Sequence, residues 1–137
     1  MRLTRQQLLT RTGPQPQPPE IWAVLDEAVI RRAVGGRDVM RGQLQRLLDI
    51  CGNPLVTVQV LPFSAGAHMA AYGSFSLFEP ADPAFPVTAS TDRPAGTLIE
   101  DDPSDTDRYT LIFNHLRAAA LNPSDTRILI SETMRLL

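Results

Sequence analysis

Three side chains of types that take part in catalysis lie close together in the stretch VTVQVLPFSAGAHMAAYGSFSLF, residues 56–78. They are Ser64, His68 and Tyr72, and they fall in a loop between two segments with alternating apolar residues. A loop histidine that faces a cleft serves as a general acid or base, and otherwise it hydrogen-bonds the backbone. No GxSxG pattern surrounds Ser64, so a nucleophile elbow is not indicated. We expect the loop to line a pocket, with His68 and Tyr72 as the catalytic candidates if the protein is an enzyme.

The residues expected to line this pocket come from the loop and from neighbouring apolar segments. They are Trp22, Phe63, Ser64, His68, Met69, Tyr72, Ser74 and Ser90. Gly66 and Gly73 permit backbone angles that other residues avoid, so the loop is able to approach a ligand closely. The aromatic residues have two interpretations, because they are most simply core and alternatively the walls of an apolar pocket. The aromatic set is Trp22, Phe63, Tyr72, Phe75, Phe78 and Phe85.

The composition excludes several kinds of chemistry. All 13 basic residues are arginine, so Schiff bases, Walker A phosphate binding and Ser-Lys dyads are excluded. The single cysteine, Cys51, excludes internal disulfides and cysteine-rich zinc sites, and its helical surroundings indicate a small buried apolar residue. His115 falls within a helical pattern, and the acidic run 100–102 suits the start of a helix better than a cation site. We therefore expect no metal and no other cofactor.

The elements that position these residues follow from the apolar pattern. Residues 21–25 predict a strand, with a turn or helical segment to about residue 34, and 37–51 predict a helix. Strands are expected in VTVQVLPF, GSFSLFEP, VTAST and TLIED. Two closing helices begin in the related sequences DPSDT and NPSDT, with Asp102 and Asn122 as N-caps and proline at the first helical position.

These elements predict an α/β protein in the broad sense, that is, a mixed α+β fold. We expect one single-layer mixed sheet of about four to five strands, packed by helices. The length of 137 residues and the 43% hydrophobic content fit one domain with a real core. We expect a helix remnant and a proline-rich connector over residues 1–19, followed by a single domain over 20–137. The net charge of −2 and the lack of a basic cluster argue against direct binding of nucleic acid.

The chain resembles a known family in five stretches that follow the family's order. They are RQQLLTR, IWAVLDEAVIRRAVGG, VMRGQLQRLLDI, NPLVTVQVLPFSAGAHMAAYGSFSLFE and GTLIEDDPSDTDRYTLIFNHLRAAALNPSDTRILI. The family is the effector domain that follows an Xre-type helix-turn-helix in many actinobacterial, antitoxin-like regulators, a domain of unknown function. A weaker likeness, to phospholipase-D-like domains, concerns only the order of strands and helices, because that chemistry pairs histidine with lysine.

Two departures from the family pattern qualify the resemblance. We expect the upstream DNA-binding part of these regulators to be missing here, and therefore no DNA binding by this chain alone. Family members also carry a tyrosine and an acidic residue in the strand that here reads VTAST, with Thr88, Ala89 and Ser90. If that strand lines the family's pocket, the pocket of this chain has smaller and less charged walls.

Two functions remain open at this point. The first, which the resemblance implies, is a stand-alone effector domain that binds a small molecule or a small partner protein. The second is a small cofactor-free enzyme of specialised metabolism, a cyclase or isomerase that reuses the ligand pocket. No signal peptide or membrane span is found in the sequence, so we expect a cytoplasmic protein. A homodimer is expected because a shortened domain exposes surface that self-association would bury.

Overall fold

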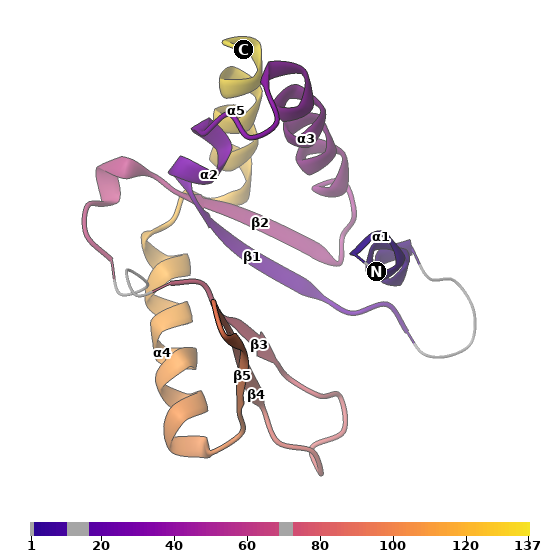
Figure 1. Ribbon diagram of the computed structural model, residues 1–137, viewed down its shortest axis with the longest axis vertical. Helices are drawn as coiled ribbons and strands as arrows, with labels where there is room; N and C mark the ends of the chain where they lie inside the picture. The colour runs from indigo at the N-terminus through magenta and orange to yellow at the C-terminus, as the bar shows by residue number, and fades with distance from the viewer. Residues whose placement is uncertain (1, 11–16, 69–72) are drawn as a thin grey trace. The chain divides into compact units, whose positions relative to one another are not determined.

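The structure is a computed structural model that describes residues 2–10, 17–68 and 73–137. Over these residues the chain is a mixed α+β protein that closes with two α-helices, which confirms the predicted class (Figure 1). In chain order the α-helices and strands are α1 (Arg2–Gln6), β1 (Ile21–Asp26), α2 (Glu27–Arg31), α3 (Arg37–Ile50), β2 (Val56–Leu61), β3 (Ser76–Phe78), β4 (Thr88–Arg93), β5 (Gly96–Glu100), α4 (Pro103–Ala119) and α5 (Pro123–Arg135). Short 3₁₀-helices cover Gln7–Thr10 and Phe63–Ala65.

The chain forms two compact units. The first unit contains residues 1–63 and 121–137, and the second contains residues 64–120. The strands form two small sheets rather than one, with β1 and β2 in the first unit and β3, β4 and β5 in the second. Where a third strand would pair with β2, the N–H of Leu121 instead donates to the carbonyl of Val60 at 2.9 Å. The expectation of a single domain over 20–137 stays a prediction.

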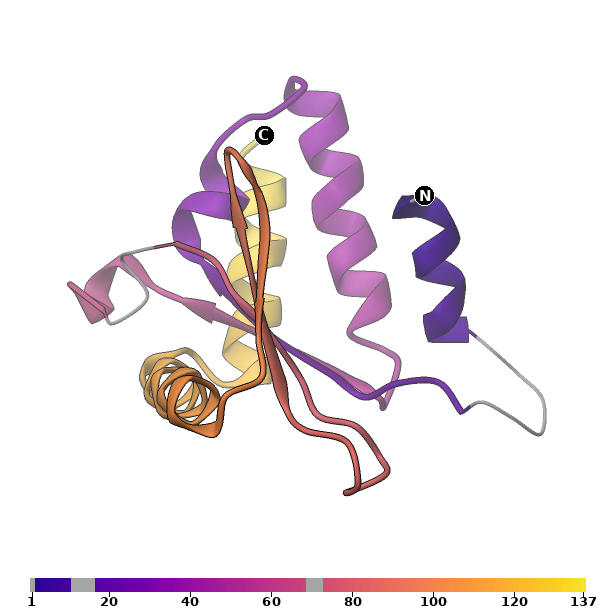
Figure 2. The ribbon, with the colours of Figure 1, turned by 60° about the horizontal axis from the view of Figure 1, so that its bottom comes forward.

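The first unit is built on the parallel pair β1 and β2. Ile21 lies opposite Val56 and Asp26 opposite Leu61. Both strands consist mainly of β-branched and other apolar residues, which pack well on a pleated surface. In Figures 1 and 2, α3 and α5 lie over the same face of this pair. The core that they enclose contains Ile30, Leu44, Val60 and Ile130.

The helix starts in the first unit follow local chemistry. Gly36 precedes α3 with a φ of 93°, a left-handed angle that favours glycine. Asn122 caps α5, since its side-chain oxygen accepts from the N–H of Asp125 at 2.8 Å, and Pro123 occupies the first helical position. Both features of α5 confirm the sequence-based expectation, and they bring the start of α5 beside β2.

The second unit is a three-stranded antiparallel sheet covered by α4. Ser90 in β4 lies opposite Ser76 in β3 and opposite Ile99 in β5. α4 packs against β3 and β4, and Asp102 caps it by accepting from the N–H of Ser104 at 2.9 Å. The rings of Phe75 and Tyr109 lie 5.1 Å apart between centroids, so α4 contacts the residue that directly precedes β3.

The core interpretation of the aromatic residues is wrong for most of them. Trp22 is 48% exposed and Phe63 is 58% exposed, and the side chains of Phe78 and Phe85 are also exposed. Only Phe75 of the described set is half-buried. The reason is that β3 has three residues, so Phe78 ends the strand and Phe85 falls in the turn region beyond it.

A buried carboxylate joins the end of β2 to the start of α2. Glu27 is 7% exposed, and it accepts the backbone N–H of Phe63 at 2.9 Å and the Nε–H of Arg31. Burial raises the pKa of the Glu27 carboxyl, but the hydrogen bonds from Phe63 and Arg31 outweigh it, so the pKa is lowered from its usual value. Its charge therefore stabilises the fold, because the ionised form is the one that accepts these bonds.

Replacing Glu27 by glutamine is expected to destabilise the protein by about 1–3 kcal/mol at pH 7, because charge-assisted hydrogen bonds are lost in a buried site. A lowered folded pKa means that this contribution is present above the unfolded pKa, about 4.3, and is lost as the pH falls through the folded value. Urea unfolding should therefore show the gap between wild type and Glu27→Gln closing under acid conditions. The exposed Glu20→Gln is the matched control, and an equal effect of the two variants at pH 7 would contradict this role.

Candidate functional site

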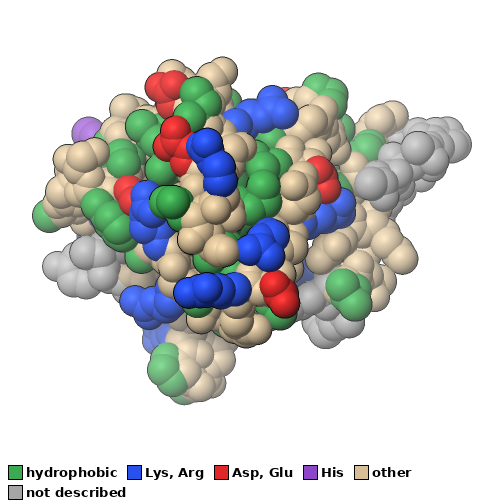
Figure 3. Space-filling model, turned by 90° about the horizontal axis from the view of Figure 1, so that it is seen from above, with side chains coloured by type: hydrophobic (Ala, Val, Ile, Leu, Met, Phe, Trp, Pro, Cys, Tyr) green, Lys and Arg blue, Asp and Glu red, His purple; other side chains and the backbone are tan. Residues whose placement is uncertain are grey.

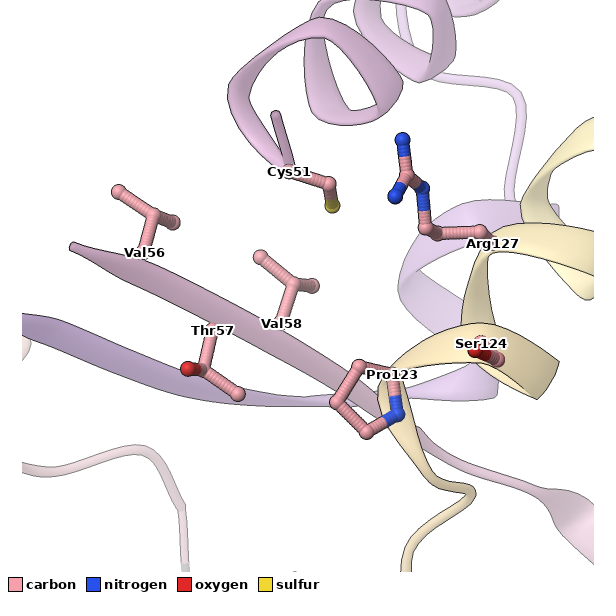
Figure 4. A pocket seen from close by; sticks show the side chains of 7 residues that line it. All are labelled: Cys51, Val56, Thr57, Val58, Pro123, Ser124 and Arg127. Atoms are coloured by element: carbon pink, nitrogen blue, oxygen red, sulfur yellow. The ribbon is translucent and has the colours of Figure 1, made fainter. Parts of the chain in front are cut away.

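A hollow of about 110 Å³ lies in the first unit at the outer edge of β2. Figure 4 shows its walls, which come from the end of α3, from β2 and from the first turns of α5. The lining residues are Cys51, Val56, Thr57, Val58, Pro123, Ser124 and Arg127.

The lining combines an apolar floor with a polar rim. The side chains of Val56 and Val58 point to the side on which Cys51 lies, whereas Thr57 points the other way, as strand alternation requires (Figure 4). The expectation that alternate valines of β2 share one face is thereby confirmed. Arg127, one turn into α5, extends its guanidinium toward Cys51 in the same view.

The backbone of β2 is open beside this hollow. The N–H of Ile21 donates to the carbonyl of Leu55 at 2.8 Å, so β1 bonds to alternate residues of β2 beginning with Leu55. The N–H and C=O groups of Val56, Val58 and Val60 must then point away from β1. Val56 donates to the carbonyl of Asn53 at 3.0 Å.

The outward N–H and C=O of Val60 both have hydrogen-bond partners, whereas those of Val58 have none among the described residues. The N–H of Val60 donates to Thr126 Oγ1 at 3.0 Å, and its carbonyl accepts from Leu121. In the part of the chain that the structure describes, neither backbone group of Val58 has a hydrogen-bond partner from the protein. Val58 is only 5% exposed, and buried backbone groups without partners are uncommon and costly.

The electrostatics of the hollow act on its thiol. Burial raises the pKa of the Cys51 thiol, and the positive charge of Arg127 offsets this only in part. A thiol with a raised pKa stays protonated at neutral pH and is a poor nucleophile. The lining contains no carboxylate and no imidazole, so it supplies no general acid–base pair.

A second depression in the first unit is broad and shallow. It lies between α3 and α5 and is lined by Asp38, Arg41, Gly42, Gln45, Met134 and Arg135. Figure 3 shows the surface of the molecule from above the view of Figure 1. Arginine, acidic and hydrophobic side chains are mixed on the part of this face that is drawn in colour.

Two of the predicted pocket residues belong to the first unit. Trp22 lies in β1, opposite Thr57, and its Nε1–H donates to the side-chain oxygen of Gln59 at 2.7 Å. Phe63 follows the end of β2. Leu61 lies four positions after Thr57 in β2, about 13 Å along the strand at the usual rise. The structure therefore places Trp22 and Phe63 toward opposite ends of the strand pair.

The other predicted residues belong to the second unit. Ser64 and Ser74 are exposed, His68 is half-buried, and Ser90 is half-buried in β4. Gly66 and Gly73, on either side of His68, have φ angles of 74° and 129°, the unusual angles expected of them. Met69 and Tyr72 lie outside the described residues. A pocket lined by this set stays a prediction.

The residues of the β2 hollow were not singled out from the sequence. Cys51 was interpreted as a buried apolar residue, and it is half-buried at the end of α3. Arg127 and Ser124 carry a signal that is visible in hindsight. The two helix starts read PSDTDRY and PSDTRIL, and only the second places an arginine directly after the shared segment.

The fold and the hollow together define a small mixed α+β domain with an open sheet edge. Residues 1–132 match the family described as "Domain of unknown function (DUF5753)", and the chain belongs to this family. Comparisons with curated proteins and with solved structures give no match. Family membership by itself assigns no activity to the chain.

None of the helices in the described part of the chain has the length and the apolar content that crossing a bilayer requires.

The alkylation of Cys51 by iodoacetamide is expected to be slow at neutral pH and to rise with a midpoint above the value of about 8.5 for a free cysteine. Arg127→Gln should move the midpoint higher still, because the charge that favours the thiolate is removed. Arg46→Gln, an exposed arginine of α3 outside the hollow, serves as the control. The pH range is the one in which circular dichroism shows the fold intact. A midpoint that falls in Arg127→Gln would contradict the assigned electrostatics.

Proposed function

We propose that this chain is a regulator-type effector domain that recognises a partner protein through the hollow at the edge of β2. The observation that carries the proposal is the combination in one place of an apolar floor, unpaired backbone groups at Val58 and the cationic Arg127. This is the composition of a recognition site, in which apolar contact supplies affinity and a few polar groups supply orientation.

The size of the hollow favours a protein partner over a free metabolite. Pockets that enclose small-molecule ligands typically measure about 300–1,000 Å³, whereas this hollow measures about 110 Å³. Such a volume holds roughly one amino-acid side chain. A partner protein would insert one side chain here and make its other contacts on the surface around it.

The regulatory context rests on the resemblance. The stretches shared with effector domains of Xre-type, antitoxin-like regulators support an actinobacterial regulator of this kind, and we propose that the partner acts through such regulation. Direct DNA binding is not part of the proposal, because the net charge is −2 and nucleic-acid binding needs clustered cations. A cytoplasmic location and a homodimer are further proposals.

The enzyme alternative rests on the loop that contains His68. If this loop carries catalysis, both His68→Ala and Tyr72→Ala should abolish turnover, whereas under the binding function they should change affinity at most. Mass spectrometry of small molecules that copurify with the chain would supply the substrate or product to be assayed. A copurifying molecule that both variants retain unchanged would argue against a site in this loop.

Filling the hollow should abolish recognition. Nuclear magnetic resonance titration with N-acetyl amino-acid amides and fragment-sized compounds is expected to shift the amide signals of Val56, Val58 and Ser124. The same compounds should slow the alkylation of Cys51. Ser124→Trp places a large side chain at the hollow and should remove both effects, whereas Ser131→Trp, on the exposed face of α5, should remove neither.

Two outcomes would contradict this proposal. The first is that the Ser124→Trp chain retains the full shifts, which would place the binding elsewhere. The second is that no compound protects Cys51 in the wild-type chain.

A further inference from the structure

The open stretch of β2 has the hydrogen-bonding pattern of a strand that lacks a neighbour. Within residues 2–10, 17–68 and 73–137, the outward backbone groups that have no hydrogen-bond partner are the N–H and C=O of Val58 and the carbonyl of Val56. Successive outward groups on a strand are the ones that an added strand uses. Val56 and Val58, which carry these groups, and Thr57 between them all line the hollow.

The open stretch is short because α5 closes it. Leu121 and Thr126 occupy the outward groups of Val60, so an added segment can pair only with the first half of β2. Its side chains would alternate in register with those of β2. A residue beside Val58 would therefore direct its side chain to the face on which Cys51 lies, which is the interior of the hollow (Figure 4).

The positive charge of Arg127 at the rim of the hollow favours an added segment of a particular charge. Arg127 is exposed, and among the described residues it takes part in no salt bridge. No acidic side chain lines the hollow with it. A guanidinium in this position favours a carboxylate, with which it forms a bidentate pair. An acidic side chain on the incoming segment complements this edge.

A second copy of the chain fits the edge poorly. If two β2 edges paired antiparallel about Val58, each Val56 would lie opposite the other chain's Val60. The segment from Leu121 to Pro123 already occupies the outer side of Val60. The pairing would also bring two Arg127 side chains of like charge to one interface, which is unfavourable.

We propose that the outer edge of β2 at Val56–Val58 accepts a short extended segment of a partner protein as an added strand, with one side chain in the hollow and an acidic residue on Arg127. This inference rests on the proposed function and names the chemistry of its partner. Recognition of this kind takes affinity from main-chain hydrogen bonds and specificity from the side-chain pocket.

The test begins with a phage-displayed library of random seven-residue peptides, selected against the full 137-residue chain. The selected sequences should contain an aspartate or glutamate and alternate with apolar residues. The best sequence is then synthesised in two forms, one unmodified and one N-methylated at the residue facing Val58. Isothermal titration calorimetry measures their affinities, and hydrogen exchange measures the protection of the Val58 amide.

The unmodified peptide should slow exchange of the Val58 amide about tenfold or more, and N-methylation should weaken binding by a similar factor. Arg127→Gln should weaken binding of the unmodified peptide about tenfold, because a charge-assisted pair is lost. Arg46→Gln should bind as the wild type does. This set of results supports strand addition.

Four outcomes overturn the inference. If peptides bind and Ser124→Trp blocks them, but N-methylation and Val58 exchange show no effect, the hollow is a recognition site without strand addition and the proposed function survives. If no peptide is selected while fragments still protect Cys51, the inference fails alone, and if neither binds both proposals fail. If sedimentation shows a dimer whose Val58 amide is protected without peptide, a second copy occupies the edge.

Discussion

The two hydrogen bonds that Val60 makes across its outer edge organise the first unit. They connect the second half of β2 to Leu121 and Thr126, more than sixty positions later in the chain. Thr126 and Val60 are fully buried there, beside Ile130. Because a buried strand must satisfy its backbone groups, the return of the chain at residue 121 completes β2 in place of another strand. α5 can pack on α3 and on the strand pair only because its first turn is held at this point.

The same constraint produces the candidate site. The cap at Val60 covers one pair of outward backbone groups and stops before the next pair, at Val58. The end of α3 and the first turn of α5 stand on either side of the uncovered stretch, and the gap between them is the hollow. The position of Arg127 follows from the same geometry, because it lies one residue after the threonine that bonds Val60. The residues that close the outer edge of β2 therefore also border the candidate site.

Much of the local structure could be predicted from the sequence. The helix over 37–51, the alternating valines of β2 and the two capped starts with proline at the first helical position are all confirmed with small shifts at their ends. These features depend on neighbours within a few residues, through capping bonds and apolar periodicity. The aromatic residues were harder to predict. Phe63 and Phe78 are exposed because burial depends on what the rest of the chain places over a side chain, which periodicity does not contain.

What the sequence determined by itself is therefore local: helix starts, strand segments, the absence of lysine chemistry and the single thiol. Tertiary structure decided which strands pair and what closes each edge. It turned Glu27, a charged residue within an apolar run, into a buried partner of Phe63, and it turned Gln59 into a link between Trp22 and Leu121. Among the residues that the structure describes, it also left the backbone of Val58 without a hydrogen-bond partner, whereas Val56 and Val60 each have one. The physical reason is that a backbone group is satisfied by whatever the fold brings within hydrogen-bond distance, and residues far apart in sequence supply it.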